Sequence, residues 1–580
     1  MPRGLVKSAY NIIVLLAFLL AFGVIVWGNQ IFYLTPFFKN MVIKLYIGHL
    51  LRGIIALPFF LVWLKLSKNP RITRVLNCIK AWWLAHPLTP VIAPVFFLLL
   101  TLLISLFGFN KIPMGDAVWP FFQAKIFAQG RLFAPAPPDF RFFATPTIVY
   151  QGKWFSYTSP GHSLILLPFY LLGTSWLCGP ILGTIGIILF YQLVKEYTDR
   201  ETARIALLLA VTSPWMLFLF ASHEFHITST FFTILALYGL TKMSRLSAAE
   251  PRTKNQELKT ICGWAFLAGL SLGMVFLARP YTAIGIGIPI ILFVIKERCR
   301  VRILDLCLIL FFVGGLIMVL LHLYYNRSLT GNWLTFPYQL MGKYHGIGFS
   351  LDYGAPTFNL PGHSPLKMFL NLAYNIFVLS LQLFGWLFLS LMFFFPGIIR
   401  SESKRLWFFW APALGLIVAY CFYWFHGITP WGPKYWSEAL PALILFSAIG
   451  IKSAPNNFSL RALPFLTLFS LLVHLPANFI YFSSGRWGET PKVWQNVRAA
   501  KIRNAVVFVK TDERSGHFDY TSAFIFNDPF LKGDIIFARD LGVEENLKFL
   551  EKFPGRSAYS YEFNTGRLTQ VKTEVEGSKH

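Results

Sequence analysis

Residues 88–108 read LTPVIAPVFFLLLTLLISLFG, an apolar stretch without a charged side chain. A helix of about 20 such residues is long enough to cross the hydrocarbon core of a membrane. Similar runs on either side predict thirteen spans, near residues 9–33, 46–66, 88–108, 177–194, 203–221, 226–242, 261–278, 281–296, 303–322, 371–396, 406–424, 437–451 and 461–481. The sequence therefore predicts a mainly α-helical bundle that passes through the membrane many times.

The composition excludes a water-soluble globular enzyme. Of the 580 residues, 55% are hydrophobic and only 13% are charged, whereas soluble domains carry about 25% charged residues. The net charge of +26 does not indicate a nucleic-acid partner, because most Lys and Arg of residues 1–481 fall on one side of the predicted spans, as the positive-inside rule requires. This pattern predicts an inner (plasma) membrane protein with its N-terminus inside and its C-terminus outside.

The chain divides into two parts. Residues 1–481 form the predicted membrane domain, with long outer loops at 109–176 and 323–370. Residues 482–580 are charged and rich in turns, with strand-like runs at 505–509, 524–526 and 535–538 and helical spacing at 544–553. We expect a small extracytoplasmic α/β domain there.

Acidic residues narrow the search for an active site, because the predicted topology places only five of those in residues 1–481 on the outer side of the membrane: Asp116, Asp139, Glu224, Asp352 and Glu438. Asp116 follows the span at 88–108 and precedes a predicted surface helix at 121–129. It could cap that helix through backbone N–H groups. It could equally act as a general base that takes a proton from an acceptor hydroxyl.

A second acidic candidate occupies a short outer turn. Glu224 lies between His223 and His226, a spacing that could ligate a divalent metal cation or bind phosphate. Ordinary interfacial polarity explains the same residues. A divalent metal is therefore a candidate cofactor.

Two cations are candidates for binding a phosphate. Arg279 lies in a very tight outer turn, where its planar fork suits an anion, although it could also snorkel to a lipid headgroup. Lys434 opens the span at 437–451, and pairing with Glu438 is the alternative to ligand binding. Polar and aromatic side chains of the outer segments suit sugars and prenyl chains, and the candidates for binding donor or acceptor are Tyr157, His162, Glu224, Tyr338 and Tyr435.

Several short motifs, by their order along the chain and their place in the predicted outer segments, resemble those of the GT-C superfamily of polytopic glycosyltransferases. The resemblance is to the family 39-like branch of protein O-mannosyltransferases and lipid A aminoarabinose transferases. The motifs are Gly115-Asp116, Tyr157–Gly173, Leu277-Ala278-Arg279-Pro280, Tyr325-Asn326 with Thr330-Gly331-Asn332, and Gly432-Pro433-Lys434-Tyr435. The chain departs from the common arrangement in having two spans before the one that leads to Asp116, and in lacking paired acidic residues around Glu224.

The resemblance implies that a sugar moves, with inversion, from a polyprenyl-phosphate donor to a glycan, lipid or protein acceptor at the extracytoplasmic face. It implies that Asp116 is the base, and Arg279 with Lys434 would stabilise the departing phosphate. Membrane lipids are the other expected partners. A transporter or flippase of lipid-linked sugars is the alternative function, and a non-catalytic assembly subunit is a third.

Overall fold

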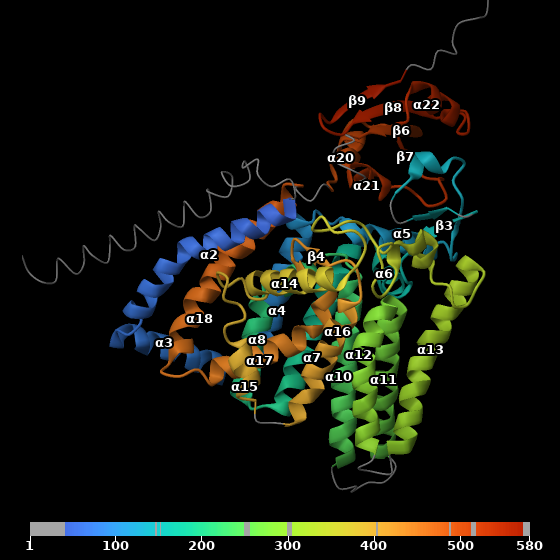
Figure 1. Ribbon diagram of the computed structural model, residues 1–580. Coiled ribbons are helices and arrows are strands. Elements are labelled where there is room, and N and C mark those ends of the chain that lie inside the picture. Colours follow the sequence, from blue (N-terminus) through green and yellow to red (C-terminus); the bar gives the residue numbers. More distant parts are fainter. Residues whose placement is uncertain are drawn as a thin grey trace, which may run out of the picture.

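The computed structural model describes residues 41–145, 148–150, 152–248, 256–298, 304–401, 404–485, 489–511 and 518–571. These residues form a bundle of helices with a small sheet at one end (Figure 1). The predicted span at 9–33 lies outside the described residues.

Long apolar helices make up much of the bundle. Within the described residues, six are long and apolar enough to cross a membrane: Ile43–Leu66, Thr89–Gly108, Ser175–Tyr197, Leu258–Ala278, Asp305–Thr330 and Phe458–Ser483. They belong to the elements α2 (Met41–Leu66), α4 (Thr89–Leu103), α7 (Cys178–Tyr197), α11 (Gln256–Ala278), α13 (Leu304–Thr330), and α18 (Phe458–Phe469) with α19 (Leu475–Ser483). The protein is therefore a multi-pass membrane protein, and the number of thirteen spans remains a prediction.

Further helices complete the bundle: α8 (Arg200–Thr212), α9 (Pro214–Ala221), α10 (His226–Ala248), α12 (Pro280–Arg298), α15 (Phe394–Ile399), α16 (Trp407–Cys421) and α17 (Leu440–Lys452). The predicted span at 203–221 is not one straight helix, because α8 and α9 meet at an angle of 57°. Pro214 cannot donate a backbone N–H to a continuous helix. Ser213 instead caps α9 by accepting a bond from the amide of Met216.

The predicted span at 371–396 is also wrong. Helix α14 (Pro365–Gln382) ends early and lies across the bundle instead of along it (Figure 1). Its buried residues include the polar Asn371, Asn375 and Gln382 beside the apolar Val378, Leu379 and Leu381, whereas Phe369 and Ile376 are exposed. The inward amides donate to carbonyl groups of a loop described below, so this helix supports that loop and does not cross the membrane as one continuous span.

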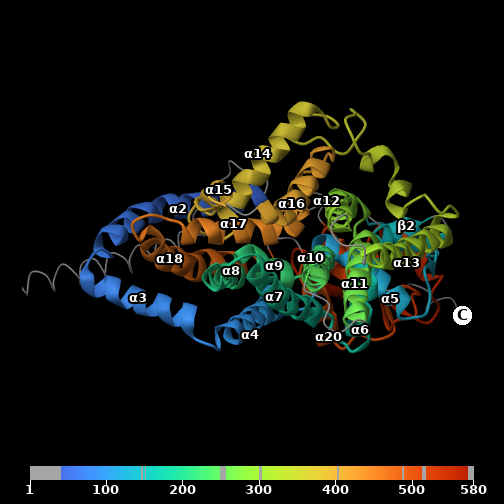
Figure 2. The ribbon, with the colours of Figure 1, turned by 90° about the horizontal axis from the view of Figure 1, so that it is seen from below.

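Two segments predicted as loops contain helices. Residues 67–87 form α3 (Pro70–Ala85), which Figure 2 places beside α2 and α18 at one edge of the bundle. The outer loop at 109–176 contains α5 (Val118–Phe127), as predicted, and α6 (Gly161–Leu171). Between these helices lies a small antiparallel sheet of β1 (Ala134–Pro135), β2 (Ile148–Tyr150) and β3 (Lys153–Ser156).

The C-terminal segment forms a four-stranded sheet of order β7-β6-β8-β9. Strand β6 (Ala505–Lys510) is parallel to β7 (Ile535–Arg539) and β8 (Ser557–Glu562), and β9 (Arg567–Gln570) is antiparallel to β8. The helices are α20 (Lys492–Ala499), α21 (Phe518–Phe524) and α22 (Val543–Leu550). The strands predicted at 505–509 and 535–538 are confirmed, whereas 524–526 is the end of α21 and a turn.

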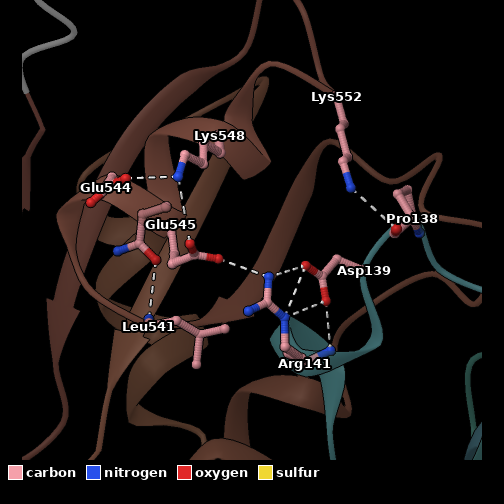
Figure 3. A network of polar contacts seen from close by, with 9 residues as sticks. Pro138, Asp139, Arg141, Leu541, Glu544, Glu545, Lys548 and Lys552 are labelled. Carbon is pink, nitrogen blue, oxygen red and sulfur yellow. Dashed lines mark hydrogen bonds and ion pairs between the residues drawn. The ribbon is translucent and has the colours of Figure 1, made fainter.

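Polar contacts hold this sheet on the first outer loop. Arg141 bridges Asp139 and Glu545 at 2.7 Å each, and Lys552 donates to the carbonyl of Pro138 (Figure 3). Lys125 of α5 is buried and donates to the carbonyls of Ile525 and Asn527. The C-terminal sheet is thus fixed to the segment that follows Asp116.

The contact between α11 and α13 depends on glycine. A side chain at Gly269 would collide with the carbonyl of Phe311, and one at Gly273 would lie 2.9 Å from the carbonyl oxygen of Gly315. Small residues let helix backbones approach closely, which is a common basis of packing in membranes.

We expect Gly269→Val to lower the free energy of unfolding by about 1–3 kcal/mol, because the added methyl groups must push the helices apart. Thermal unfolding in detergent measures the loss. The matched control is Gly263→Val on the same helix, where an added Cβ meets nothing within 4 Å. Equal losses in both variants would contradict the packing argument.

Candidate functional site

Asp116 lies in a short 3₁₀ turn, Gly115–Ala117, directly before α5. Its side chain makes no capping bond to that helix, so the N-cap hypothesis is wrong. The carboxylate instead forms an ion pair with Lys434, a residue 318 positions later in the chain. Gly115 adopts a φ of +59°, which a residue without Cβ tolerates, and this turn directs Asp116 toward the interior of the site.

Lys434 is almost fully buried, with 4% of its side chain exposed. Its ammonium group also lies 3.9 Å from Glu224, in the turn between α9 and α10. The predicted pairing of Lys434 with Glu438 is wrong, because both residues lie in a 3₁₀ helix, Lys434–Ala439. At three residues per turn, side chains four apart point in different directions.

A short hairpin positions Lys434. Strands β4 (Ile428–Thr429) and β5 (Gly432–Pro433) pair directly before it. Side chains of α2 and α14 hold the backbone of residues 424–430 by hydrogen bonds. On α14, Asn371 donates to the carbonyl of Trp424, Asn375 to that of His426 and Gln382 to that of Pro430. On α2, Tyr46 donates to the carbonyl of Thr429. The inward polar face of α14 therefore fixes the segment that carries the buried ammonium group.

Arg279 lies at the junction of α11 and α12, where Pro280 begins the second helix. The guanidinium group is buried and binds Glu438 at 3.0 Å and the hydroxyl of Tyr420 at 2.6 Å. It also lies 5.4 Å from the ring centre of Tyr435 and 5.7 Å from that of Phe225. Arg279 is thus held by a carboxylate and enclosed by aromatic faces, and it does not snorkel to a lipid surface.

Two further carboxyl groups adjoin the Asp116–Lys434 pair. Burial raises the pKa of Glu224 to about 7; the charge on Asp116 adds to this rise, and Lys434 and Arg279 oppose it. Glu489, which is 1% exposed, accepts a 2.7 Å bond from the amide of Gly115. Burial, with the charges of Asp116 and Glu224, raises the pKa of Glu489 well above its ordinary value. Through its bond to the Gly115 amide, Glu489 holds the turn that carries Asp116.

A cavity of about 140 Å³ adjoins these groups. It brings together three of the predicted binding residues, Tyr157, Tyr338 and Tyr435, with Arg279. The remaining wall includes Phe225, Tyr281, His345, Tyr420 and Tyr423. Burial raises the pKa of Tyr157, and the negative charge of Asp116 is the next cause, so the carboxylate acts electrostatically on the cavity wall.

The histidines near Glu224 have different environments. His162 is fully buried, and its ring nitrogens bond to the hydroxyl of Thr228 at 2.8 Å and to the carbonyl of His223 at 2.9 Å. It therefore fixes the 222–225 turn, and it is not among the residues that line the cavity. His226 stacks on Phe225 and Tyr435.

The divalent metal expected at His223, Glu224 and His226 stays a prediction. Among the described residues, no three His, Cys, Asp or Glu side chains converge closely enough to hold a metal ion. Proximity in the sequence does not bring the three side chains around one point. We therefore assign no step of the chemistry to a metal.

Comparison with known proteins identifies the architecture. Residues 174–325 match the family model described as dolichyl-phosphate-mannose-protein mannosyltransferase. ArnT from Cupriavidus metallidurans in the apo state superposes with a TM-score of 0.52 and 14% identity, over 81% of this chain and 92% of that chain. The chain has the GT-C fold. The structure of ArnT bound to undecaprenyl phosphate gives a TM-score of 0.50 and 12% identity, over 82% and 93% of the two chains. The comparison with curated proteins gave no match.

Sequence reasoning missed several residues of this GT-C site. Glu489 was not predicted, because the acidic candidates were all taken from residues 1–481, where the last apolar run ends. It is the first acidic residue after that run, which is the signal that could have identified it. The predicted spans at 281–296 and 406–424 include Tyr281, Tyr420 and Tyr423. These tyrosines line the cavity because α12 packs against α16.

The pKa of Glu224 generates a testable pH dependence. Between its ordinary value of about 4.3 and about 7, the folded protein keeps a proton that the unfolded chain has lost, so stability falls as pH rises. Glu224→Gln removes this dependence. We expect the thermal midpoint of the variant to rise relative to that of the parent between about pH 5 and about pH 8.

Differential scanning fluorimetry across this pH range measures the effect. Glu544→Gln is the control, because that carboxylate is exposed and paired only with Lys548. A constant difference between Glu224→Gln and the parent at every pH would refute the elevated pKa.

Proposed function

We propose that this protein is an integral-membrane glycosyltransferase that moves a sugar from a polyprenyl-phosphate donor to an acceptor hydroxyl, with inversion. One observation carries the proposal: Asp116 is joined to the buried Lys434 beside an aromatic cavity whose wall contains Arg279. A carboxylate base and cations for a phosphate leaving group are the groups that this reaction needs. The GT-C fold and the mannosyltransferase family match support the same reaction class.

Asp116 is the proposed general base. Its side chain is 35% exposed, more than that of Lys434 or Glu224, so an acceptor can reach it. The acceptor oxygen attacks the anomeric carbon and its proton passes to Asp116. The bond between that carbon and the phosphate oxygen breaks, and its electron pair leaves with the prenyl phosphate. Attack opposite to the leaving group inverts the anomeric centre.

Arg279 is the proposed phosphate ligand. A guanidinium group has five N–H donors, and the bonds to Glu438 and Tyr420 occupy two of its nitrogens. Since Arg279 also lines the cavity, its remaining donors can contact a phosphate there. Lys434 sits between Asp116 and Glu224 and adds a second positive charge. Both cations stabilise the charge that develops on the departing phosphate.

The cavity wall is suited to a sugar and the start of a prenyl chain. Tyr157, Tyr338 and Tyr435 offer ring faces and hydroxyl groups. The C-terminal sheet is fixed to the same end of the bundle through Lys125 and Arg141, where it can dock a glycan, lipid or protein acceptor. We place this end on the extracytoplasmic side of the inner membrane. The positions of these charges in loops and at helix ends favour transfer over transport of the donor, because transporters bind substrate near the bilayer midplane.

Asp116→Asn should reduce sugar transfer by at least about 100-fold, because removal of a general base typically costs that much or more. Mass spectrometry of the donor and acceptor after incubation with the purified protein measures the rate. Asp352→Asn changes an exposed outer carboxylate and should retain full activity. A transfer rate in Asp116→Asn equal to that of this control would eliminate Asp116 as the base.

Arg279→Lys should weaken binding of undecaprenyl phosphate about tenfold, which corresponds to about 1.4 kcal/mol. Lysine keeps the positive charge opposite Glu438 but lacks the planar guanidinium group, which can bind phosphate through two N–H donors at once. Binding of the purified variant to the lipid by microscale thermophoresis measures the change. The thermal midpoint shows whether the variant is folded, and a folded variant with unchanged affinity would remove Arg279 from the phosphate site.

A further inference from the structure

A second, larger cavity of about 740 Å³ lies between α3 and the beginning of α18. It is remote from the site described above. Arg461 of this cavity is near one end of the apolar span Phe458–Ser483, whereas Glu489 of the active site follows the other end. Figures 1 and 2 place α2, α3 and α18 together at one edge of the bundle.

The lining of this groove is cationic. Its eight described residues are Lys68, Pro70, Thr73, Arg74, Asn77, Cys78, Ala81 and Arg461. Three are positively charged and none is acidic. Thr73 and Asn77 add hydrogen-bonding groups beside the cations. A groove with this lining attracts an anion and can bind it through several donors.

One donor in the groove has no partner. The Nε atom of Arg461 is buried and makes no hydrogen bond within the described structure. A buried donor without an acceptor is unfavourable, and native proteins rarely leave one unsatisfied. An anionic oxygen bound beside Arg461 would satisfy it.

The groove is held in shape by local bonds. Asn69 caps α3 by accepting from the amide of Arg71 at 2.9 Å, and the hydroxyl of Thr73 donates to the carbonyl of Ser67 at 2.9 Å. The indole of Trp63 on α2 donates to the carbonyl of Arg461 at 2.6 Å. The three helices that surround the cations are therefore tied to one another.

An apolar surface adjoins the cations. Helix α3 exposes Val75, Ile79 and Trp82, spaced four and three residues apart on one face, at 58%, 58% and 50%. The neighbouring α2 exposes Leu61 and Val62. An amphipathic helix with basic residues and an exposed Trp is typical of the membrane interface. A free anion would use only the cations, whereas a lipid would use both surfaces.

We propose that the groove between α3 and α18 binds the phosphate headgroup of an anionic membrane lipid. Lys68, Arg74 and Arg461 contact the phosphate, and the acyl chains lie along the exposed apolar faces of α3 and α2. Basic pockets between membrane helices bind anionic headgroups in this manner. The groove anchors α3 at the membrane interface, and the proposal does not depend on the sugar-transfer reaction.

Native mass spectrometry of the full-length protein, incubated with phosphatidylglycerol or phosphatidylcholine, tests the proposal. The parent should retain phosphatidylglycerol in preference to phosphatidylcholine. The double variant Arg74→Ala with Arg461→Ala should retain about tenfold less phosphatidylglycerol, because two charge-assisted contacts are lost. Arg74→Ala alone changes an exposed side chain, leaves the fold intact and should show part of this loss.

Arg71→Ala is the matched control, since Arg71 is an exposed cation on the same helix that does not line the groove. It should retain the lipid as the parent does. Equal loss in this control would replace the site with general surface attraction, and unchanged retention in the double variant would exclude the site. Displacement of phosphatidylglycerol by equimolar inorganic phosphate would show that the acyl chains contribute nothing, which also overturns the proposal.

Discussion

The buried ammonium group of Lys434 is the constraint on which the active site depends. A charge that is 4% exposed is tolerated only if opposite charges compensate for the lost hydration. Asp116 provides such a charge, and Glu224 lies 3.9 Å from the ammonium group, so both come to Lys434 from other segments of the chain. The need to neutralise one lysine therefore brings together the first outer loop, the turn between α9 and α10, and the hairpin before Lys434.

The surrounding architecture keeps this cluster in place. Helix α14 turns Asn371, Asn375 and Gln382 inward to bind the hairpin segment, and the buried Glu489 holds the turn of Asp116 through the amide of Gly115. These bonds explain why α14 is amphipathic in the reverse sense of a soluble helix. Its exposed side includes Phe369 and Ile376, whereas its inward amides donate to backbone carbonyls of the hairpin segment.

Much of the site could be predicted, because rare residues in apolar surroundings are informative. Asp116, Arg279 and Lys434 were conspicuous as charges beside predicted spans, and the structure places all three in one cluster with Tyr435. Their partners were not predictable. Lys434 bonds Asp116 and not its sequence neighbour Glu438, since the 3₁₀ geometry turns the two side chains apart.

The amino-acid sequence alone predicts a multi-pass helical membrane protein and singles out the charged residues of the candidate site. Both conclusions follow from local properties, namely the length of apolar runs and the cost of placing a charge next to them. The tertiary structure was needed to show which charges pair and that residues 371–396 do not form one span. It also shows that three tyrosines of the predicted spans line a cavity. Those outcomes depend on packing between segments hundreds of residues apart, which no local pattern records.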